Sequence, residues 1–353
     1  MTDEKPIIDP DELILVTGAA GFVGSKLVKT LVDRGFKNIR CFGRPSGAID
    51  KIQSIAGSNG KANVDIVKGN LLSREDCAAA AKDAAVIFHL AAGRGEKSFP
   101  DAFSNSVVTT RNLLEASLQC ASLKRFVSIS SFSVYSNRNK PRWRQLDESC
   151  PVEERSELRG DAYCFAKVKQ DELVTEYARR FAIPYVIVRP GYVIGPGNEQ
   201  ITGRVGIDTF GVFLHLGGSN PIPFTYVDNC VDAIVLAGFK AGVEGEVFNI
   251  VDDDLPSSRQ FLKLYKQKVR HFRSVYVPHV VSYALCGAWE SYANWSKGQL
   301  PLAFNRRRWH VDWKKTQYAN NKAKVRLGWT PKVSMTEGLE RYFESCRMKG
   351  RNA

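Results

Sequence analysis

Tyr163 and Lys167 are the side chains of this sequence best suited to act together in proton transfer. They lie four residues apart in the segment DAYCFAK (161–167), on one face of the helix that the pattern predicts over 161–181. A free phenol has a pKa of about 10 and is a poor base at neutral pH. A neighbouring ammonium favours the phenolate, which could exchange a proton with a substrate hydroxyl or carbonyl. We therefore predict Tyr163 as an acid/base that Lys167 tunes.

A group of serine hydroxyls distinguishes this pair from a chance spacing. Tyr318 and Lys322 are also four residues apart, but no strand end, serine group or glycine-rich turn accompanies them. Ser130 and Ser131, by contrast, follow a predicted strand over 126–129, at the carboxyl edge where ligands of α/β sheets bind. A serine at that edge can hydrogen-bond a reacting oxygen.

A glycine-rich turn, TGAAGFVG (17–24), follows the first apolar strand (13–16) and opens a helix predicted over 22–34. Glycines here let the backbone turn tightly and let a pyrophosphate approach the helix N-terminus, where free N–H groups and the helix dipole favour negative charge. The spacing is G-x-x-G-x-x-G rather than the standard G-x-G-x-x-G. Its position still predicts a dinucleotide site, with contacts from Gly18, Ala20, Gly21, Phe22, Val23 and Gly24.

The end of the second strand bears on the choice of dinucleotide. A carboxylate there would bind the adenosine ribose hydroxyls. The segment CFGRPS (41–46) has none, and Arg44 could instead hold a 2′-phosphate, so NADP is favoured over NAD. The alternative is a surface arginine that only stacks on adenine. An oxidised nicotinamide ring would further favour the Tyr163 phenolate, and Lys167 would anchor the nicotinamide ribose.

The order of the elements predicts an α/β fold, a Rossmann-type doubly wound parallel sheet with a smaller, mainly helical C-terminal substrate domain. Further apolar strands are predicted at 39–42, 64–67, 86–88, 185–188 and 248–250, and helices at 74–82 and 101–118. Alternating strands and helices imply parallel crossovers with both sheet faces covered. The dinucleotide-binding domain is predicted over 11–190, with 225–250 returning to it. The Gly- and Pro-rich loops of 191–224, together with 251–350, would bind the substrate.

Composition indicates a globular protein with an anionic partner or ligand. Of 353 residues, 44% are hydrophobic and 25% charged, and the formal net charge is +13. The eight cysteines show no C-x-x-C pair, which favours reduced thiols, and the five scattered histidines predict no metal site. Residues 1–11 lack the apolar region of a secretory signal, so a cytoplasmic location is expected.

The C-terminal region combines apolar and basic segments. Residues 275–295 are rich in Val, Tyr, Leu, Ala and Trp but too short and polar to span a bilayer, and 261–315 hold eleven Lys or Arg against two acids. This pattern fits an apolar lid for a hydrophobic substrate or peripheral contact with an anionic membrane. The alternative is a helical cap with a solvated basic face. The basic cluster 306–308 alone does not predict nucleic-acid binding.

Together these motifs resemble the extended short-chain dehydrogenase/reductase family, which includes nucleotide-sugar epimerases and dehydratases. The similarity covers nearly the whole chain, and its marks are TGAAGFVG (17–24), FHLAA (88–92), Asn105, TRNLLEA (110–116), Ser130, Ser131, Tyr163, Lys167, RPGYVIGPG (189–197), YVDN (226–229) and LGWTP (327–331).

The resemblance implies roles for individual residues. Ser131, four residues before Tyr135, matches the catalytic Ser/Thr beside Tyr163 and Lys167. Asn70 stands where the family usually has an Asp that contacts adenine, and an amide can also hydrogen-bond that ring. Implied cofactor contacts, besides Tyr163, Lys167 and the turn, are Arg44, Asn70, Leu71, Leu90, Ala91, Ala92, Asn105, Ser130, Pro190 and Val193.

Two departures bear on the branch of the family. Nucleotide-sugar enzymes usually carry Asn where this chain has Tyr192, and an Arg shortly before the YVD segment, where 220–224 have none. The Arg-Pro-Gly form is more similar to the 3β-hydroxysteroid dehydrogenase and dihydroflavonol reductase branch. The leading expectation is an NAD(P)-dependent oxidoreductase acting on a hydrophobic or sugar-derived substrate. The alternatives are a nucleotide-sugar epimerase/dehydratase and a non-catalytic dinucleotide-binding protein. By analogy, a homodimer through 101–118 and 161–181 is also expected.

Overall fold

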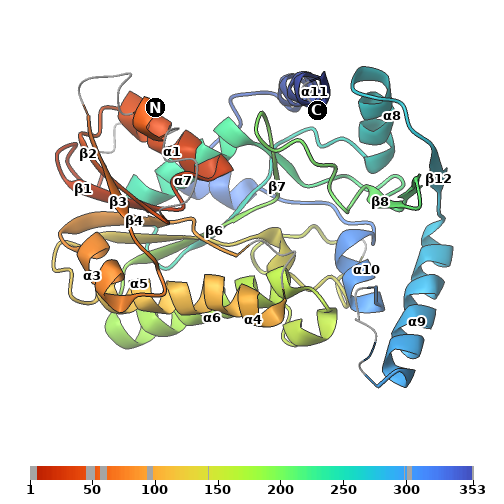
Figure 1. The fold of residues 1–353 in the computed structure, drawn as a ribbon, viewed down its shortest axis with the longest axis horizontal. Helices are drawn as coiled ribbons and strands as arrows, with labels where there is room; N and C mark the ends of the chain where they lie inside the picture. Colours follow the sequence, from red (N-terminus) through yellow and green to blue (C-terminus); the bar gives the residue numbers. More distant parts are fainter. Residues whose placement is uncertain are drawn as a thin grey trace.

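The computed structural model describes residues 6–44, 52–55, 62–93, 98–141, 143–297, 299 and 304–351. A seven-stranded parallel sheet forms its centre (Figure 1), in the order β11-β6-β5-β4-β1-β2-β3. These strands are β1 (Leu13–Thr17), β2 (Asn38–Gly43), β3 (Asn63–Lys68), β4 (Ala84–His89), β5 (Arg125–Ile129), β6 (Tyr185–Pro190) and β11 (Val247–Ile250). The predicted α/β Rossmann-type sheet is confirmed, and each of the seven predicted strands is present.

Helices cover both faces of this sheet. In Figure 1, α1 (Phe22–Asp33) and α7 (Val227–Phe239) lie on one face. The opposite face is covered by α3 (Arg74–Ala81), α4 (Phe99–Ala102), α5 (Thr109–Ser117) and α6 (Ala162–Phe181). Successive strand residues point to opposite faces, so Ile14 and Val16 pack under α1 whereas Leu15 packs with the residues of α3 and α5. This is why inner strands such as β1 and β4 are nearly continuous runs of buried residues, whereas the edge strand β3 has only half-buried and exposed ones.

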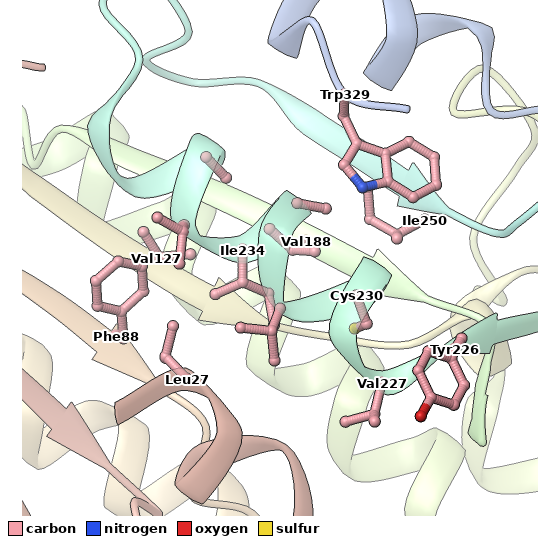
Figure 2. Packing of buried hydrophobic residues seen from close by; sticks show 14 of the residues in the cluster. Leu27, Phe88, Val127, Val188, Tyr226, Val227, Cys230, Ile234, Ile250 and Trp329 are labelled. Carbon is pink, nitrogen blue, oxygen red and sulfur yellow. The ribbon is translucent and has the colours of Figure 1, made fainter. Parts of the chain in front are cut away.

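Helix α7 packs directly on the sheet (Figure 2). Its Cys230 and Ile234 belong to the same buried cluster as the strand residues Phe88, Val127 and Val188 and as Leu27 of α1. Trp329 closes the end of this core beside Ile250, and its indole N–H donates to the carbonyl oxygen of Asn229 at 2.9 Å.

One predicted helix differs in its winding. Residues 101–118 do not form a regular α-helix throughout, because a π-helical segment, η1 (Phe103–Val108), separates α4 from α5. The sequence pattern of η1 predicts a helix but does not distinguish π from α winding. Short π segments occur often at functional sites.

The remaining part of the protein contains more strand than predicted. The Gly- and Pro-rich stretch 191–224 holds β7 (Tyr192–Ile194) and the hairpin β8 (Gly206–Thr209) and β9 (Val212–His215). β10 (Phe224–Tyr226) pairs with β7, and β12 (Ser274–Tyr276) pairs with β9. The interpretation of this stretch as loops alone was therefore wrong: strands of three or four residues are too short to show a clear period in sequence.

The C-terminal helices are α8 (Ser258–Lys268), α9 (His279–Trp295), α10 (Arg306–Asp312) and α11 (Met335–Arg351), with the π segment η4 (Ala323–Leu327). Two short 3-10 turns, η2 (Phe132–Val134) and η3 (Ser156–Arg159), lie near the start of α6. Among the described residues, no helix combines the length and apolar character of a transmembrane segment. All eight cysteines are free thiols and seven are buried, as expected for reduced cysteines.

Candidate active site

A cavity of about 500 Å³ opens at the carboxyl ends of β5 and β6 and receives the start of α6. Ser131, Tyr163 and Lys167 all line it, although Ser131 is separated from the other two by more than thirty residues of sequence. Asp161 positions the helix that carries the pair, because its carboxylate accepts the backbone N–H groups of Tyr163 and Cys164 at 3.1 and 3.2 Å. The structure thus brings the three predicted catalytic side chains to one wall of this cavity, which we call the catalytic cavity after that prediction.

The surroundings of Tyr163 in the protein keep its phenol in the neutral form. Burial raises the pKa of Tyr163 to about 12, and a hydrogen bond with Ser131 acts in the opposite direction. The Ser131 hydroxyl itself accepts the backbone N–H of Ser133 at 3.1 Å, which fixes its rotamer in the turn after β5. Ser131 and Tyr163 therefore form a preoriented pair of hydroxyls.

Lys167 is buried and anchored at its ammonium end. Nζ donates to the carbonyl oxygen of Ile129 at 2.6 Å and to Gln170 Oε1 at 3.0 Å. Burial lowers the pKa of Lys167 to about 8, while the charge of Asp171 acts to raise it. The side chain is therefore fixed in place, and its pKa lies closer to neutral pH than that of an ordinary lysine.

A buried hydrogen-bond chain behind Lys167 was not foreseen from the sequence. Gln170 Nε2 donates to Thr110 Oγ1 at 2.7 Å, and His89 Nε2 lies 2.8 Å from the same oxygen. His89 Nδ1 in turn lies 2.8 Å from Thr17 Oγ1, at the start of the glycine-rich turn. The chain thus connects α6, α5, β4 and β1 through side chains that are far apart in sequence.

The protonation state of His89 follows from these contacts. The Thr110 hydroxyl donates to the carbonyl oxygen of Ser106 at 2.5 Å, so His89 Nε2 must supply the proton of its own bond to Thr110. Burial lowers the pKa of His89 to about 3, with the charge of Lys167 acting in the same direction. His89 is therefore a neutral structural link at physiological pH.

Asp171 and Arg189 form a buried ion pair beneath the site. The guanidinium donates to Asp171 Oδ2 from Nε at 3.1 Å and from Nη2 at 2.9 Å, and the Ser130 hydroxyl donates to the same oxygen at 2.9 Å. Burial raises the pKa of Asp171, and Arg189 and Ser130 oppose this effect. The pair ties α6 to β5 and β6 at the catalytic edge.

A second cavity of about 280 Å³ lies beside β1, β2 and β4, next to the point where the strand order reverses. The predicted cofactor residues on its wall are Gly18, Arg44, Asn70, Leu71, Ala91, Ala92 and Asn105. Asn105 comes from the π segment η1, whose neighbour Ser106 accepts the backbone N–H of Gly93 at 2.9 Å. Pro45 and Ser46, which follow Arg44, lie outside the described residues.

The other predicted cofactor residues divide into two groups. Those on the wall of the catalytic cavity are Val23, Leu90, Ala92, Ser130, Tyr163, Lys167, Pro190 and Val193. Those in the connection from β1 to α1, outside the lining of either cavity, are Ala20, Gly21, Phe22 and Gly24. Ala92 lines both cavities, so the two cavities adjoin as the two ends of an extended dinucleotide would require.

The glycine-rich turn fits an approaching pyrophosphate. Gly21 is the N-cap of α1 and provides no side-chain cap, so the first N–H groups of the helix keep their donor capacity. Gly18 has φ +70°, and a Cβ there would lie 2.8 Å from the backbone nitrogen of Ala91. A Cβ at Gly24 would lie 2.1 Å from the carbonyl oxygen of Gly18. Both glycines are thus required by close backbone contacts around the turn.

Replacing Gly24 by alanine should therefore destabilise the protein. We expect the free energy of unfolding to fall by about 1–3 kcal/mol, because the clash is with backbone and outweighs the roughly 1 kcal/mol that alanine gains in helix propensity. Denaturant unfolding followed by circular dichroism measures the change. Gly43→Ala is the matched control, because a Cβ at that position meets nothing within 4 Å. Equal stability of the two variants would contradict the packing argument.

The catalytic cavity also has charged walls that were not predicted. Arg204, Arg308 and Asp312 line it, the last two from α10. Arg204 Nη1 donates to the carbonyl oxygen of Val311 at 2.7 Å, and Arg308 Nε lies 3.4 Å from Asp312 Oδ2. Only the folding of α10 against residues 203–204 brings these groups to the site, so no local sequence signal could have placed them there.

The basic cluster on α10 is paired rather than free. Arg306 pairs with Glu290 at 2.9 Å, Arg307 with Glu153 at 3.0 Å, and Arg308 with Asp312. The cluster therefore links α10 to α9 and to the segment before η3.

Residues 14–251 of the chain match the profile of the NAD dependent epimerase/dehydratase family. A UDP-glucose 4-epimerase of Mycolicibacterium smegmatis is 28% identical, over 95% of this chain and 98% of its own. The 3beta-hydroxysteroid-dehydrogenase/decarboxylase isoform 1 of Arabidopsis thaliana is 24% identical, over 98% of this chain and 82% of its own.

A solved structure agrees in fold. The UDP-glucuronic acid 4-epimerase from Bacillus cereus, in complex with UDP-glucuronic acid and NAD, superposes with a TM-score of 0.72 at 23% identity, covering 95% of this chain and 99% of that one. At this level of identity the likeness concerns the arrangement of the elements.

Proposed function

The chain belongs to the NAD dependent epimerase/dehydratase family and is an enzyme, and we propose that it is an oxidoreductase that transfers hydride at a hydroxyl or carbonyl carbon. The observation that carries this proposal is the meeting of Ser131, Tyr163 and Lys167 on one wall of the catalytic cavity. A bound nicotinamide dinucleotide would supply the hydride donor or acceptor. Retention of all three side chains speaks against a non-catalytic dinucleotide-binding protein.

Each residue has a distinct part in the proposed reaction. Tyr163 donates its phenolic proton to the carbonyl oxygen during reduction and takes it back during oxidation. Ser131 holds the same oxygen by a hydrogen bond. The Lys167 ammonium, held by its bond to Ile129, stabilises the phenolate that forms, and it would also be the residue that holds the nicotinamide ribose of a bound dinucleotide.

The substrate would lie between the sheet edge and the C-terminal part of the protein. We assign substrate binding to residues 191–224 and 251–350, which contribute Asn198, Thr202, Arg204, Arg308 and Asp312 to the cavity wall. Tyr192 also lines the cavity, and its hydroxyl donates to the carbonyl oxygen of Gln200 at 3.1 Å. We expect the substrate bound here to be a hydrophobic or sugar-derived secondary alcohol or ketone.

We further propose NADP(H) as the preferred dinucleotide. Arg44 is exposed on the wall of the second cavity, whose lining contains no carboxylate among the described residues. A guanidinium at that corner matches the geometry of a 2′-phosphate.

Arg44→Gln should lower the affinity for NADPH by about 10- to 100-fold and leave the affinity for NADH unchanged. The interaction lost is the charge-assisted hydrogen bond from Arg44 to the 2′-phosphate, a group that NADH lacks. Tryptophan-fluorescence titration of the nucleotide-free protein with each dinucleotide measures both constants. Arg180→Gln, on the exposed end of α6, is the control. An equal loss for both dinucleotides, or none for either, would contradict the assignment.

Nucleotide-sugar epimerisation is a second candidate, favoured by the arginines of the catalytic cavity. Arg204 and Arg308 bring positive charge to its wall, where a diphosphate could bind even though Tyr192 replaces the usual Asn. The curated relatives include such enzymes. In this reaction the hydride returns to the substrate, so no net oxidation of the dinucleotide occurs.

One set of assays tests the proposed reaction against this alternative. The purified protein is first analysed for co-purified nucleotide. It is then supplied with NADPH and a 3-ketosteroid or a dihydroflavonol, and separately with UDP-glucose or UDP-glucuronic acid. Oxidation of NADPH supports the reductase. Tightly retained dinucleotide with interconversion of the UDP-sugar, and no net oxidation, would favour the epimerase instead.

A further inference from the structure

The outward side of α9 is an unusually continuous apolar surface. At about 100° per residue, Val280, Ala284, Ala288, Ser291 and the larger residues between them fall within an arc of about 140° that contains no charged side chain. Five large side chains on this arc are exposed, including Val280 at 82% and Trp295 at 76%. We call this surface the α9 outer face, defined by Val280, Val281, Leu285, Tyr292 and Trp295.

The concentration of exposed apolar residues is local. Val275 and Tyr276 of β12 are also exposed, so seven of the fifteen large hydrophobic side chains that are exposed in the described part of the chain lie within 275–295. Figure 1 shows α9 at the edge of the molecule, with α10 between it and the central sheet. Val280, Val281 and Trp295 point away from the buried residues of α9, whereas Leu285 and Tyr292 lie at the margin of the outer face.

The inner side of α9 is only lightly packed. Its fully buried residues are the small side chains Ser282, Cys286 and Ala293. Beside them lies an apolar cavity of about 430 Å³, lined by Trp289 and Trp313 and also by Leu285 and Tyr292 from the margin of the outer face. The apolar character of the helix is therefore greater than its packing against the protein requires.

Basic side chains flank this apolar surface at both ends. Arg270 and Arg273 are exposed just before β12, and Lys297 is exposed just after α9. None of these three forms an ion pair with a carboxylate within the described ranges. Glu290, the only acidic residue of α9, pairs with Arg306 at 2.9 Å. The segment from 270 to 297 consequently presents a net positive charge next to the outer face.

We propose that the α9 outer face binds the surface of an anionic membrane. Its aliphatic and aromatic side chains would enter the interfacial region with the helix parallel to the bilayer, while Arg270, Arg273 and Lys297 would contact lipid phosphates. The net charge of +13 attracts such a surface but repels a second copy of the chain. α10, which packs on α9, carries Arg308 and Asp312 of the catalytic cavity, so binding places that cavity near the lipid. The proposal does not depend on the reaction proposed above.

Sedimentation with extruded vesicles tests this proposal. The wild-type protein should bind vesicles of phosphatidylcholine and phosphatidylglycerol, should bind pure phosphatidylcholine more weakly, and should be released as salt is raised. Val280→Glu and Leu285→Glu should each lower binding to the anionic vesicles on the order of 10-fold. Val325→Glu is a matched control on η4, because Val325 is 81% exposed, as Val280 is 82% exposed. It should bind as the wild type does.

The emission of tryptophan adds a readout that does not depend on substitution. Binding should shift the wild-type spectrum to shorter wavelength, because exposed Trp295 would enter a less polar medium. The proposal is overturned if the wild type does not bind anionic vesicles or if Val325→Glu weakens binding as much as Val280→Glu. It is also overturned if light scattering shows a wild-type dimer that Val280→Glu converts to monomer, since the face would then join two copies.

Discussion

Replacing Tyr163 by phenylalanine should lower turnover by about 10²- to 10⁴-fold and leave dinucleotide affinity within about twofold of the wild type. The substitution removes only the phenolic oxygen, which is the group proposed to exchange a proton with the substrate. Burial already raises the pKa of Tyr163 to about 12, so the neutral phenol is available as the donor for reduction at neutral pH. Turnover is measured on the compound that the wild type reduces fastest, and affinity by fluorescence titration.

The control for this prediction lies on the same helix. Tyr177 is half-buried on α6, and its hydroxyl donates to Glu115 Oε1 at 3.2 Å, away from the catalytic cavity. Tyr177→Phe removes an equivalent hydroxyl and should leave turnover within about twofold, because this hydroxyl does not line the catalytic cavity. Retention of more than a tenth of wild-type turnover by Tyr163→Phe would contradict the acid/base role.

Replacing Asp171 by asparagine should lower the free energy of unfolding by about 3–5 kcal/mol. The side chain keeps its shape, but Arg189 loses its counter-charge while it remains buried, and its two hydrogen bonds to Asp171 Oδ2 would be accepted by a neutral amide oxygen instead of a carboxylate. Removing one partner of a buried ion pair lowers the free energy of unfolding by more than the intact pair contributes to it, because the remaining charge stays desolvated. Chemical denaturation of both proteins gives the difference.

An exposed ion pair provides the comparison. Asp33 pairs with Lys29 one turn earlier on α1 at 2.8 Å, and both side chains are more than half exposed. Asp33→Asn should change the free energy of unfolding by no more than about 0.5 kcal/mol, because solvent screens the pair. If the two variants were equally stable, Asp171 would have no special structural part at the catalytic edge.

Much of the N-terminal fold follows from local sequence pattern. The inner strands β1, β4, β5 and β6 are runs of mostly buried residues that reflect burial on both faces, whereas the edge strand β3 has only half-buried and exposed residues. The glycine-rich turn is local in part: a Cβ at Gly24 would meet the carbonyl oxygen of Gly18 within the turn, whereas a Cβ at Gly18 would meet Ala91 after β4. The helical spacing of Tyr163 and Lys167 is a local pattern.

Other features depended on partners that sequence pattern does not reveal. β12 pairs with β9 across the intervening α7, β11 and α8, and strands of three or four residues show no clear period of their own. The π winding of η1 and the chain of contacts from Thr17 through His89 to Gln170 likewise require elements that meet only in the folded protein. Burial, not residue type, holds His89 neutral.

The amino-acid sequence by itself determined the parallel sheet, the dinucleotide turn and the two members of the catalytic set that share a helix. The individual strands, the turn and the helix pair show as patterns among residues a few positions apart, and the alternation of strands with helices then implies parallel crossovers. The tertiary structure decided that Ser131 joins them, that Arg204 and Arg308 line the same cavity, and that one side of α9 is exposed. Such outcomes depend on the distances between elements far apart in the chain, and packing of the whole molecule sets those distances.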